Sequence, residues 1–343
     1  MKTSNHPDLK AWRARLRGAL LPAVPVPFTE RGEIDGPAHG AYTAYMSGQP
    51  LAGVAVWAHT GRGLRLTRQQ RREVLTAWRS ALSQDKTVVA GVGASPEILD
   101  PKQHSESAVG MAAEAASLGA DALLVHPPTI YRGRLRLAAQ EPKLDPLNLD
   151  SNEASTLKYH QQVAAAGLPL IVFYLYEAAG GICYSPRLLR KLLSMPEVVA
   201  VKMATLDSVT TFQDVARIIT EEFPEKTLIT GEDRFLGYSL MCGAQAALIG
   251  MGAVCVKLQH ALLQAFFNGD AAQFLQLSRV VDTLAQALFI HPMEGYIRRT
   301  LCALAHLGVL PQTAVYDPWG PSLNKDEFQH IGQVLRLLGE WAQ

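Results

Sequence analysis

The chain repeats one pattern eight times: a short segment of apolar residues, a loop marked by glycine or proline, and a stretch long enough for a helix. Small and β-branched residues dominate the apolar segments, as is typical of strands that are buried on both faces in parallel sheets covered by helices. The segments are Ala19–Val26, Leu51–Trp57, Thr87–Val92, Ala120–Val125, Leu168–Tyr174, Val198–Lys202, Thr227–Ile229 and Ala246–Gly250.

Eight such units are what a closed barrel of eight parallel strands requires. We therefore predict an α/β fold, a TIM (β/α)8 barrel with a C-terminal helical appendix. A doubly wound open sheet is the alternative. The open sheet is disfavoured because a closed barrel accounts for all eight units and because no Gly-x-Gly-x-x-Gly turn follows the first segment.

Helical patterns flank the repeat on both sides. Residues 1–18 form an N-terminal helical extension, with an amphipathic helix over Asp8–Arg17 that we interpret as a lid or an oligomer contact. Residues 19–256 form the barrel, and residues 257–343 carry helical patterns only and are expected to pack on it. The longest irregular stretch is 132–152, and loops of that length are usually functional or mobile.

Composition excludes several classes of protein. Of the 343 residues, 48% are hydrophobic and 18% are charged, which indicates a globular chain, and a net charge of +1 gives no reason to expect a nucleic-acid or membrane partner. No Cys-x-x-Cys or His-Glu-x-x-His spacing occurs, so no metal site is predicted. The start lacks the apolar core of a signal peptide and no apolar stretch approaches a membrane span, so we expect a cytoplasmic location.

A single lysine ends the sixth apolar segment. In a parallel barrel Lys202 would leave the sheet at its carboxyl edge, where catalytic groups gather. Burial disfavours the ammonium form, so we expect a lowered pKa and a neutral amine that can attack a ketone to give a Schiff base. The alternative is that Lys202 only ends a strand and extends its amine into solvent.

Four motifs along the chain point to a family. They are PVPFTERGEID at the first strand, AHTGRGLRLT after the second, FYLYEAAGG at the fifth and VAVKMAT at the sixth. In this order and spacing they resemble the dihydrodipicolinate synthase and N-acetylneuraminate lyase family, class I Schiff-base enzymes that act on pyruvate or related 2-oxo acids. The resemblance runs from about Leu20 to Val256, and more weakly into the tail. It implies a covalent Schiff base on Lys202 and no cofactor.

The resemblance also implies a proton-relaying tyrosine on the fifth strand, and we assign this role to Tyr174. Its spacing to a later glycine matches the family motif, whereas alignment from Pro169 would place Phe173 there instead. We prefer Tyr174 because only a phenol can exchange a proton, although Tyr176 lies two residues away on the same side of a strand. An aromatic core residue is the alternative interpretation of Tyr174.

Further site residues follow from the same resemblance. His59, Thr60 and Gly61 fall where the family's paired threonines hold the substrate carboxylate with backbone amides. His59 replaces a threonine, and it could relay protons or only fill the pocket. Tyr131 corresponds to a tyrosine that reaches across a subunit interface into the neighbour's site.

The loop after the seventh strand also carries a candidate. Gly231, followed by Glu232 and Asp233, resembles a glycine-acidic loop near the substrate tail. A turn and the start of a helix are an equally good interpretation of these residues.

Three departures argue against the family's best-known activity. Arg62 replaces the family's glutamate, and Ala179 stands where a dihydrodipicolinate synthase has the arginine that grips a second carboxylate. The stretch 132–152 is an insertion expected over the mouth. We therefore predict an aldolase or dehydratase for another 2-oxo acid, such as a sugar-derived one, assembled as a homotetramer or dimer. The alternatives are a catalytically silent member that binds a small acid and a metal-dependent barrel lyase.

Overall fold

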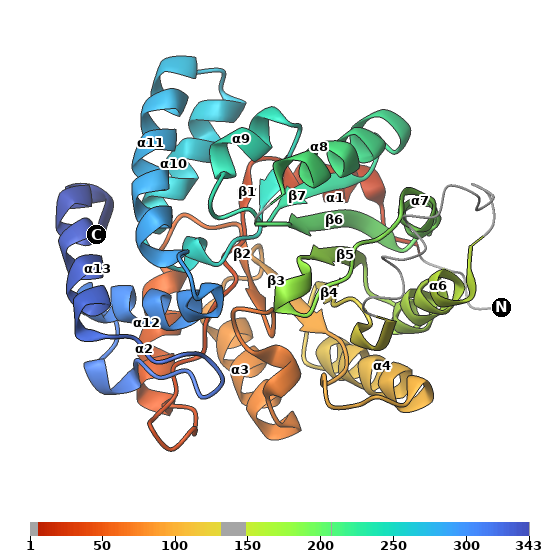
Figure 1. Ribbon diagram of the computed structural model, residues 1–343, viewed down its shortest axis with the longest axis horizontal. Coiled ribbons are helices and arrows are strands. Elements are labelled where there is room, and N and C mark those ends of the chain that lie inside the picture. Colours follow the sequence, from red (N-terminus) through yellow and green to blue (C-terminus); the bar gives the residue numbers. More distant parts are fainter. Residues whose placement is uncertain (1–5, 132–148, 207, 343) are drawn as a thin grey trace.

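The computed structural model describes residues 6–131, 149–206 and 208–342. Eight parallel strands form a ring in the order β1-β8-β7-β6-β5-β4-β3-β2, surrounded by helices (Figure 1). The predicted TIM barrel is confirmed. The strands are β1 (Ala19–Leu20), β2 (Gly53–Val56), β3 (Thr87–Val92), β4 (Ala122–Val125), β5 (Leu170–Leu175), β6 (Val198–Ala204), β7 (Thr227–Thr230) and β8 (Ala246–Ala247).

The first strand is shorter than the predicted Ala19–Val26. Prolines lack a backbone N–H, and Pro22 and Pro25 interrupt the ladder that the sequence pattern suggests. The barrel nevertheless closes at this point. Ala55 N donates to Pro22 O at 2.8 Å and Val24 N donates to Ala55 O at 3.1 Å.

Helices cover the outside of the ring, and polar N-caps set where most of them start. Asp100 caps α4 ahead of a proline at its first position, which fixes the start of this helix. Of the stretch 132–152, residues 132–148 lie outside the described residues, and Asp150 caps α6. The helices are α2 (Gly36–Ser47), α3 (Arg68–Ala81), α4 (Pro101–Ser117), α6 (Ser151–Ala164), α7 (Pro186–Leu193), α8 (Val209–Arg217) and α9 (Leu236–Met241).

The N-terminal helix α1 (Leu9–Leu16) lies at the amino end of the barrel. Leu16 is buried in the apolar cluster inside the ring, and Arg15 Nη2 donates to Asp85 O at 3.1 Å, just before β3. Lys202 lies toward the opposite, carboxyl end of β6. The interpretation of this helix as a lid over the site is therefore wrong, and a role in oligomer contacts stays a prediction.

The C-terminal helices gather on one side of the barrel (Figure 1). Their apolar residues belong to the same continuous core as the outer faces of the strands. They are α10 (Val256–Phe267), α11 (Ala271–Leu288), α12 (Tyr296–His306) and α13 (Lys325–Leu338). Within the described ranges, no helix combines the length and the apolar character that crossing a bilayer would need.

One irregularity in β6 decides which way its last residues face. The pairing between β5 and β6 shifts by one residue, as in a β-bulge, so that Val199 is extra. Val199 and Ala200 both belong to the cluster inside the barrel. Alternation then resumes, with Val201 in the outer cluster and Lys202 facing the interior.

Candidate active site

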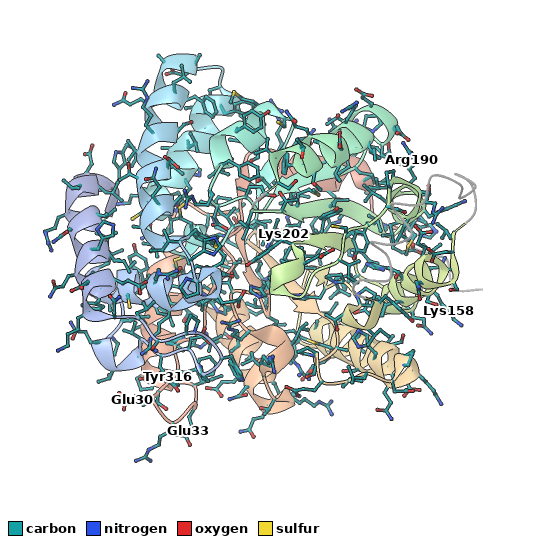
Figure 2. All side chains as sticks on the ribbon, viewed as in Figure 1. Glu30, Glu33, Lys158, Arg190, Lys202 and Tyr316 are labelled. Atoms are coloured by element: carbon teal, nitrogen blue, oxygen red, sulfur yellow. The ribbon has the colours of Figure 1, made fainter. Side chains whose placement is uncertain are left out.

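Lys202 is enclosed inside the barrel. Its side chain is 5% exposed, and Nζ lies 4.2 Å from the centroid of the Phe173 ring (Figure 2). Within the described residues, Nζ has no hydrogen bond or ion pair. Burial lowers the pKa of Lys202 from 10.5 to about 8, against the carboxyl groups of Asp233 and Glu232, which raise it. At pH 7 roughly a tenth of such an amine is neutral, whereas an ordinary lysine has far less than a hundredth.

Two buried carboxyl groups follow β7, and the one on Asp233 lines the cavity at Lys202. Asp233 Oδ1 accepts from Met251 N at 2.6 Å, and Glu232 accepts from Thr205 N at 2.6 Å and from Leu206 N at 2.8 Å. Burial raises the pKa of each carboxyl group to about 7, although these hydrogen bonds act in the opposite direction. The two carboxyl groups thus anchor the loops around Lys202 and raise the pKa of its amine. The interpretation of Glu232 and Asp233 as only a turn and the start of a helix did not include this role.

Gly231 lies directly against the lysine stem. A methyl group at this position would come within 2.7 Å of Lys202 Cε. Only glycine leaves room for the lysine in its present course. The predicted proximity of Gly231 to the substrate tail stays a prediction.

The loop after β2 uses some of its backbone amides in its own turn and leaves others without an acceptor among the described residues. Gly61 N donates to Ala58 O at 3.0 Å, so this amide is engaged in the turn, and the assignment of Gly61 to the substrate site stays a prediction. The amides of His59 and Thr60 have no acceptor in the part of the chain that the structure describes. The loop continues into a short 3-10 turn (Gly63–Arg65), and α3 begins only at Arg68.

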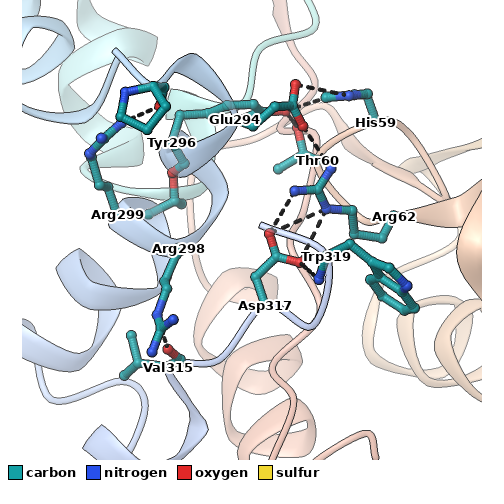
Figure 3. Close-up of polar contacts among 12 residues, drawn as sticks. His59, Thr60, Arg62, Glu294, Tyr296, Arg298, Arg299, Val315, Asp317 and Trp319 are labelled. Carbon is teal, nitrogen blue, oxygen red and sulfur yellow. Dashed lines mark hydrogen bonds and ion pairs between the residues drawn. The ribbon is translucent and has the colours of Figure 1, made fainter. Parts of the chain in front are cut away.

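The side chains of this loop meet the C-terminal region (Figure 3). Tyr296 Oη lies 2.9 Å from Thr60 Oγ1 and 3.1 Å from His59 Nδ1, and His59 Nε2 lies 3.4 Å from Glu294 Oε1. Burial lowers the pKa of His59 to about 4, so the imidazole is neutral at pH 7. Tyr296 and Glu294 had no signal in the sequence, because their helical pattern gives no sign that they reach the barrel mouth.

Arg62 ties the same loop to the C-terminal segment (Figure 3). Its guanidinium donates to Asp317 Oδ2 at 2.7 Å and to Glu294 Oε2 at 2.8 Å. Asp317 is almost completely buried, and Arg62 is nearly so. The residue that departs from the family pattern thus links the barrel mouth to the helical appendix.

Tyr174 faces away from the lysine. In β5, Phe173 and Leu175 belong to the cluster inside the barrel, whereas Tyr174 belongs to the outer cluster. Its ring packs edge-on against the Tyr184 ring, with the two ring centroids 5.6 Å apart, under the covering helices. Because successive strand residues alternate between faces, the assignment of Tyr174 as the proton relay is wrong, and Phe173 occupies the inward position.

Tyr131 does not reach this site either. It ends a short 3-10 turn (Thr129–Tyr131) and lines a surface groove between α4 and α6, together with Lys102 and Lys158. It does not line the cavity at Lys202 in its own chain. Its predicted role in a neighbouring subunit stays a prediction.

Two neighbouring cavities lie at this end of the barrel. The inner one, about 30 Å³, is bounded by Lys202, Thr60, Tyr176, Asp233 and Tyr296, among others. The outer one measures about 330 Å³. His59 and Leu175 form part of the wall of both. The cavity at the lysine is thus small, and the larger cavity lies directly across His59 and Leu175 from it.

A (β/α)8 barrel with a buried, partly neutral lysine at the carboxyl end of the sixth strand defines a lyase of the class I aldolase type. The chain belongs to the dihydrodipicolinate synthetase family, whose model matches residues 144–336. This confirms the resemblance seen in the sequence.

Individual relatives are distant but cover most of the chain. A 4-hydroxy-tetrahydrodipicolinate synthase from Parasynechococcus marenigrum is 25% identical over 79% of this chain and 80% of its own length. The N-acetylneuraminate lyase of Mus musculus is 27% identical over 77% of this chain and 75% of its own.

Solved structures share the fold. Dihydrodipicolinate synthase from Agrobacterium tumefaciens matches with a TM-score of 0.76 at 22% identity, covering 95% of this chain and 99% of that one. A prophage protein of the dihydrodipicolinic acid synthase family from E. coli K12, solved with pyruvate, matches with a TM-score of 0.76 at 19% identity, covering 93% and 98%.

Proposed function

We propose that the chain is a Schiff-base-forming lyase for pyruvate or a related 2-oxo acid, with Lys202 as the residue that forms the covalent bond. The observation that carries this proposal is the buried amine of Lys202, whose pKa is lowered to about 8. A neutral amine attacks the C2 carbonyl, water leaves, and the resulting iminium withdraws electrons from C3. A bond at C3 or C4 can then be broken or formed.

The amides of His59 and Thr60 are the proposed binding site for the substrate carboxylate. Both belong to the loop that borders the inner cavity, beside Lys202. Fixed N–H donors that are not used within the protein are suited to hold an anion without reorganisation. Binding there would leave C2 of the acid facing the lysine.

The charge at the outer cavity supports a substrate with an uncharged tail. Both arginines in the wall of this cavity are already paired: Arg62 with Glu294 and Asp317, and Arg65 with Glu97. Ala179 lines the same cavity and brings no charge to it. A second carboxylate on the substrate would therefore find no unpaired guanidinium among the described residues of this wall. We therefore propose a sugar-derived or similar neutral-tailed 2-oxo acid and an activity other than 4-hydroxy-tetrahydrodipicolinate synthesis.

We further propose that the chain assembles as a homodimer or homotetramer. Support comes from the family resemblance, in which a tyrosine like Tyr131 enters a neighbour's site. Analytical ultracentrifugation of the full chain tests the assembly, and a monomer at micromolar concentration would contradict it. Comparing wild type with Tyr131→Phe in turnover would then test the intersubunit role.

Reductive trapping tests the proposed chemistry. The protein is incubated with pyruvate and a panel of 2-oxo acids and reduced with borohydride, and the adduct is located by peptide mass mapping. Lys202→Met should abolish the adduct. The matched control is Lys226→Met, which removes another buried lysine whose Nζ donates to Val198 O at 2.7 Å. This variant should keep the adduct.

The same experiment separates the alternatives. A stable adduct on Lys202 supports the Schiff-base lyase. Turnover that is lost with EDTA and leaves no adduct would favour the metal-dependent lyase. Reversible binding of a small acid, with neither adduct nor turnover, would favour a silent member that acts as a sensor.

A further inference from the structure

The reaction at Lys202 needs a group that moves protons, and the inward position of β5 cannot supply one. Phe173 occupies that position, with its ring centroid 4.2 Å from Lys202 Nζ, and a phenyl ring exchanges no proton. Tyr174 lies on the outer face of the sheet. Two other phenols line the inner cavity, Tyr176 after β5 and Tyr296 at the start of α12.

Of these two, Tyr296 is the better connected. Its Oη contacts Thr60 Oγ1 at 2.9 Å and His59 Nδ1 at 3.1 Å, whereas Tyr176 donates only to Glu294, at 3.5 Å. The far nitrogen of His59 in turn lies 3.4 Å from Glu294 Oε1, and the Glu294 side chain is 35% exposed. These contacts link Tyr296, which lines the cavity at Lys202, through His59 to the partly exposed Glu294 (Figure 3).

The segment that carries Tyr296 is firmly held. The Tyr296 ring stacks on Phe289 with centroids 4.6 Å apart and an interplanar angle of 21°. Arg299 is completely buried and donates to the backbone oxygens of Ile290 at 2.8 Å and Pro292 at 3.3 Å. A methyl group at Gly250 would lie 2.9 Å from Tyr296 Cε2, so the glycine leaves space for the phenol. Fixed geometry of this kind favours proton transfer over short distances.

We propose that Tyr296, His59 and Glu294 form the proton path of this enzyme, with Tyr296 as the catalytic acid and base. The proposal rests on the Schiff-base function proposed above. Glu294 is ionised, so His59 keeps its proton on Nε2, facing the carboxylate. Nδ1 then accepts the Tyr296 hydroxyl proton, and Tyr296 Oη accepts from Thr60. The resting path is therefore oriented to take a proton from the substrate.

The proton transfers balance over one turnover. In cleavage, the C4 hydroxyl gives its proton to Tyr296 Oη while the phenol proton moves to His59 Nδ1 and the Nε2 proton moves to Glu294. The C3–C4 bond breaks, its electron pair forms the C2=C3 double bond while the iminium π pair moves onto nitrogen, and an enamine and an aldehyde result. The same groups then return one proton to C3 and restore the iminium. Exchange of C3 protons on bound pyruvate uses the same path.

Hydrogen exchange of pyruvate in D2O tests the path separately from the covalent step. Wild type should form the borohydride-trapped adduct and exchange the methyl protons of pyruvate, followed by proton NMR. Tyr296→Phe should form as much adduct but exchange about 100-fold more slowly or worse. Glu294→Gln should slow exchange as well, because an amide does not take up a proton from His59. Tyr174→Phe, on the outer face, is the matched control and should exchange at the wild-type rate.

Each result bears on a different claim. Absence of the adduct in wild type would overturn the proposed function and the path with it. Normal adduct with wild-type exchange in Tyr296→Phe would overturn the path alone, as would loss of exchange confined to Tyr176→Phe. Thermal unfolding of each variant, compared with wild type, shows whether a loss of exchange reflects the missing phenol or a disturbed fold, since a disturbed fold would also reduce adduct formation.

Discussion

Phe173 and Lys202 are paired residues of neighbouring strands, and the lysine amine lies 4.2 Å from the centre of the phenylalanine ring. The contact places an aromatic face beside the group proposed to form the Schiff base. An ammonium ion is attracted to such a face, but the ring gives it no hydrogen bond. The site therefore tolerates both protonation states of the amine.

Replacing the aromatic residues of β5 should separate the two faces of the strand. Tyr174→Phe should keep adduct formation and turnover within about two-fold of wild type, because its hydroxyl lies outside the barrel. Phe173→Ala should destabilise the fold by about 3 to 5 kcal/mol, as expected for a buried aromatic side chain. Denaturant unfolding measures the second effect. A large loss of turnover in Tyr174→Phe would contradict the placement of its side chain.

Removing the lysine should stabilise the protein. Its pKa falls from 10.5 in the unfolded chain to about 8 in the fold, so the folded state disfavours the ammonium form. Below pH 8 the full cost applies, about 3 kcal/mol at 1.36 kcal/mol per pKa unit. Lys202→Met should therefore unfold at higher urea concentration than wild type at pH 7.

The sign of the pH dependence follows from proton binding. Between pH 8 and 10.5 the unfolded chain binds more protons than the folded one, so wild-type stability rises with pH and the advantage of Lys202→Met shrinks. Unfolding curves at pH 7 and pH 10 measure this. An advantage of the methionine variant that grows with pH would refute the assignment.

The carboxyl group of Asp233 should tune the amine. Its charge raises the pKa of Lys202, so Asp233→Asn should lower that pKa further while the amide oxygen still accepts from Met251 N. The initial rate of adduct formation, measured against pH, should then reach half its maximum below pH 8. Asp214→Asn, on an exposed helix, should leave the midpoint unchanged. An upward shift in Asp233→Asn would show that the carboxyl group acts in the opposite direction.

A methyl group at Gly231 should displace the lysine. Because it would lie 2.7 Å from Lys202 Cε, Gly231→Ala should reduce the rate of adduct formation by about 100-fold, on the scale expected for misplacing a reacting group by about 1 Å. Gly110→Ala is the matched control, since no atom lies within 4 Å of the added carbon. It lies inside α4 and should stabilise the protein by about 0.5 to 1 kcal/mol. Equal adduct rates in the two variants would disprove the contact.

The Arg62 cross-link should matter for stability. Arg62→Ala leaves Asp317 buried without its charged partner and removes one of the contacts of Glu294, so we expect a loss of about 3 to 5 kcal/mol in the free energy of unfolding. Arg217→Ala removes an exposed ion pair within one helix and should cost less than about 0.5 kcal/mol. Similar small losses in both variants would mean that the cross-link contributes little.

The barrel was predictable because each strand carries its own signal. β3 lies where the pattern placed it, and β1 is shorter only because its prolines cannot continue the ladder. The position of Lys202 could also be predicted from the sequence, since a single charged residue near the end of an apolar strand is expected at the carboxyl edge of the sheet. These inferences need only local periodicity and the general rule that barrel sites lie at the carboxyl ends of the strands.

The rest of the site depends on contacts between distant segments. Tyr296 and Glu294 approach His59 only because the C-terminal helices fold back over the mouth of the barrel. Their sequence pattern predicts helix and nothing more. Tyr174 was assigned because a phenol can exchange a proton, but the alternation of residues along the strand places Phe173, and not Tyr174, inside the barrel.

The extra residue Val199 has a consequence for comparing this chain with its relatives. If β6 alternated without interruption from Val198, which faces the helices, Lys202 would do the same and its amine would be walled off from any keto acid. One inserted residue therefore separates an enzyme from an inert barrel. An alignment that deletes or misplaces this residue would assign the lysine to the wrong face of the strand. For each candidate member, the number of residues between the bulge and the lysine should therefore be counted, because an odd or an even number decides which face the lysine is on.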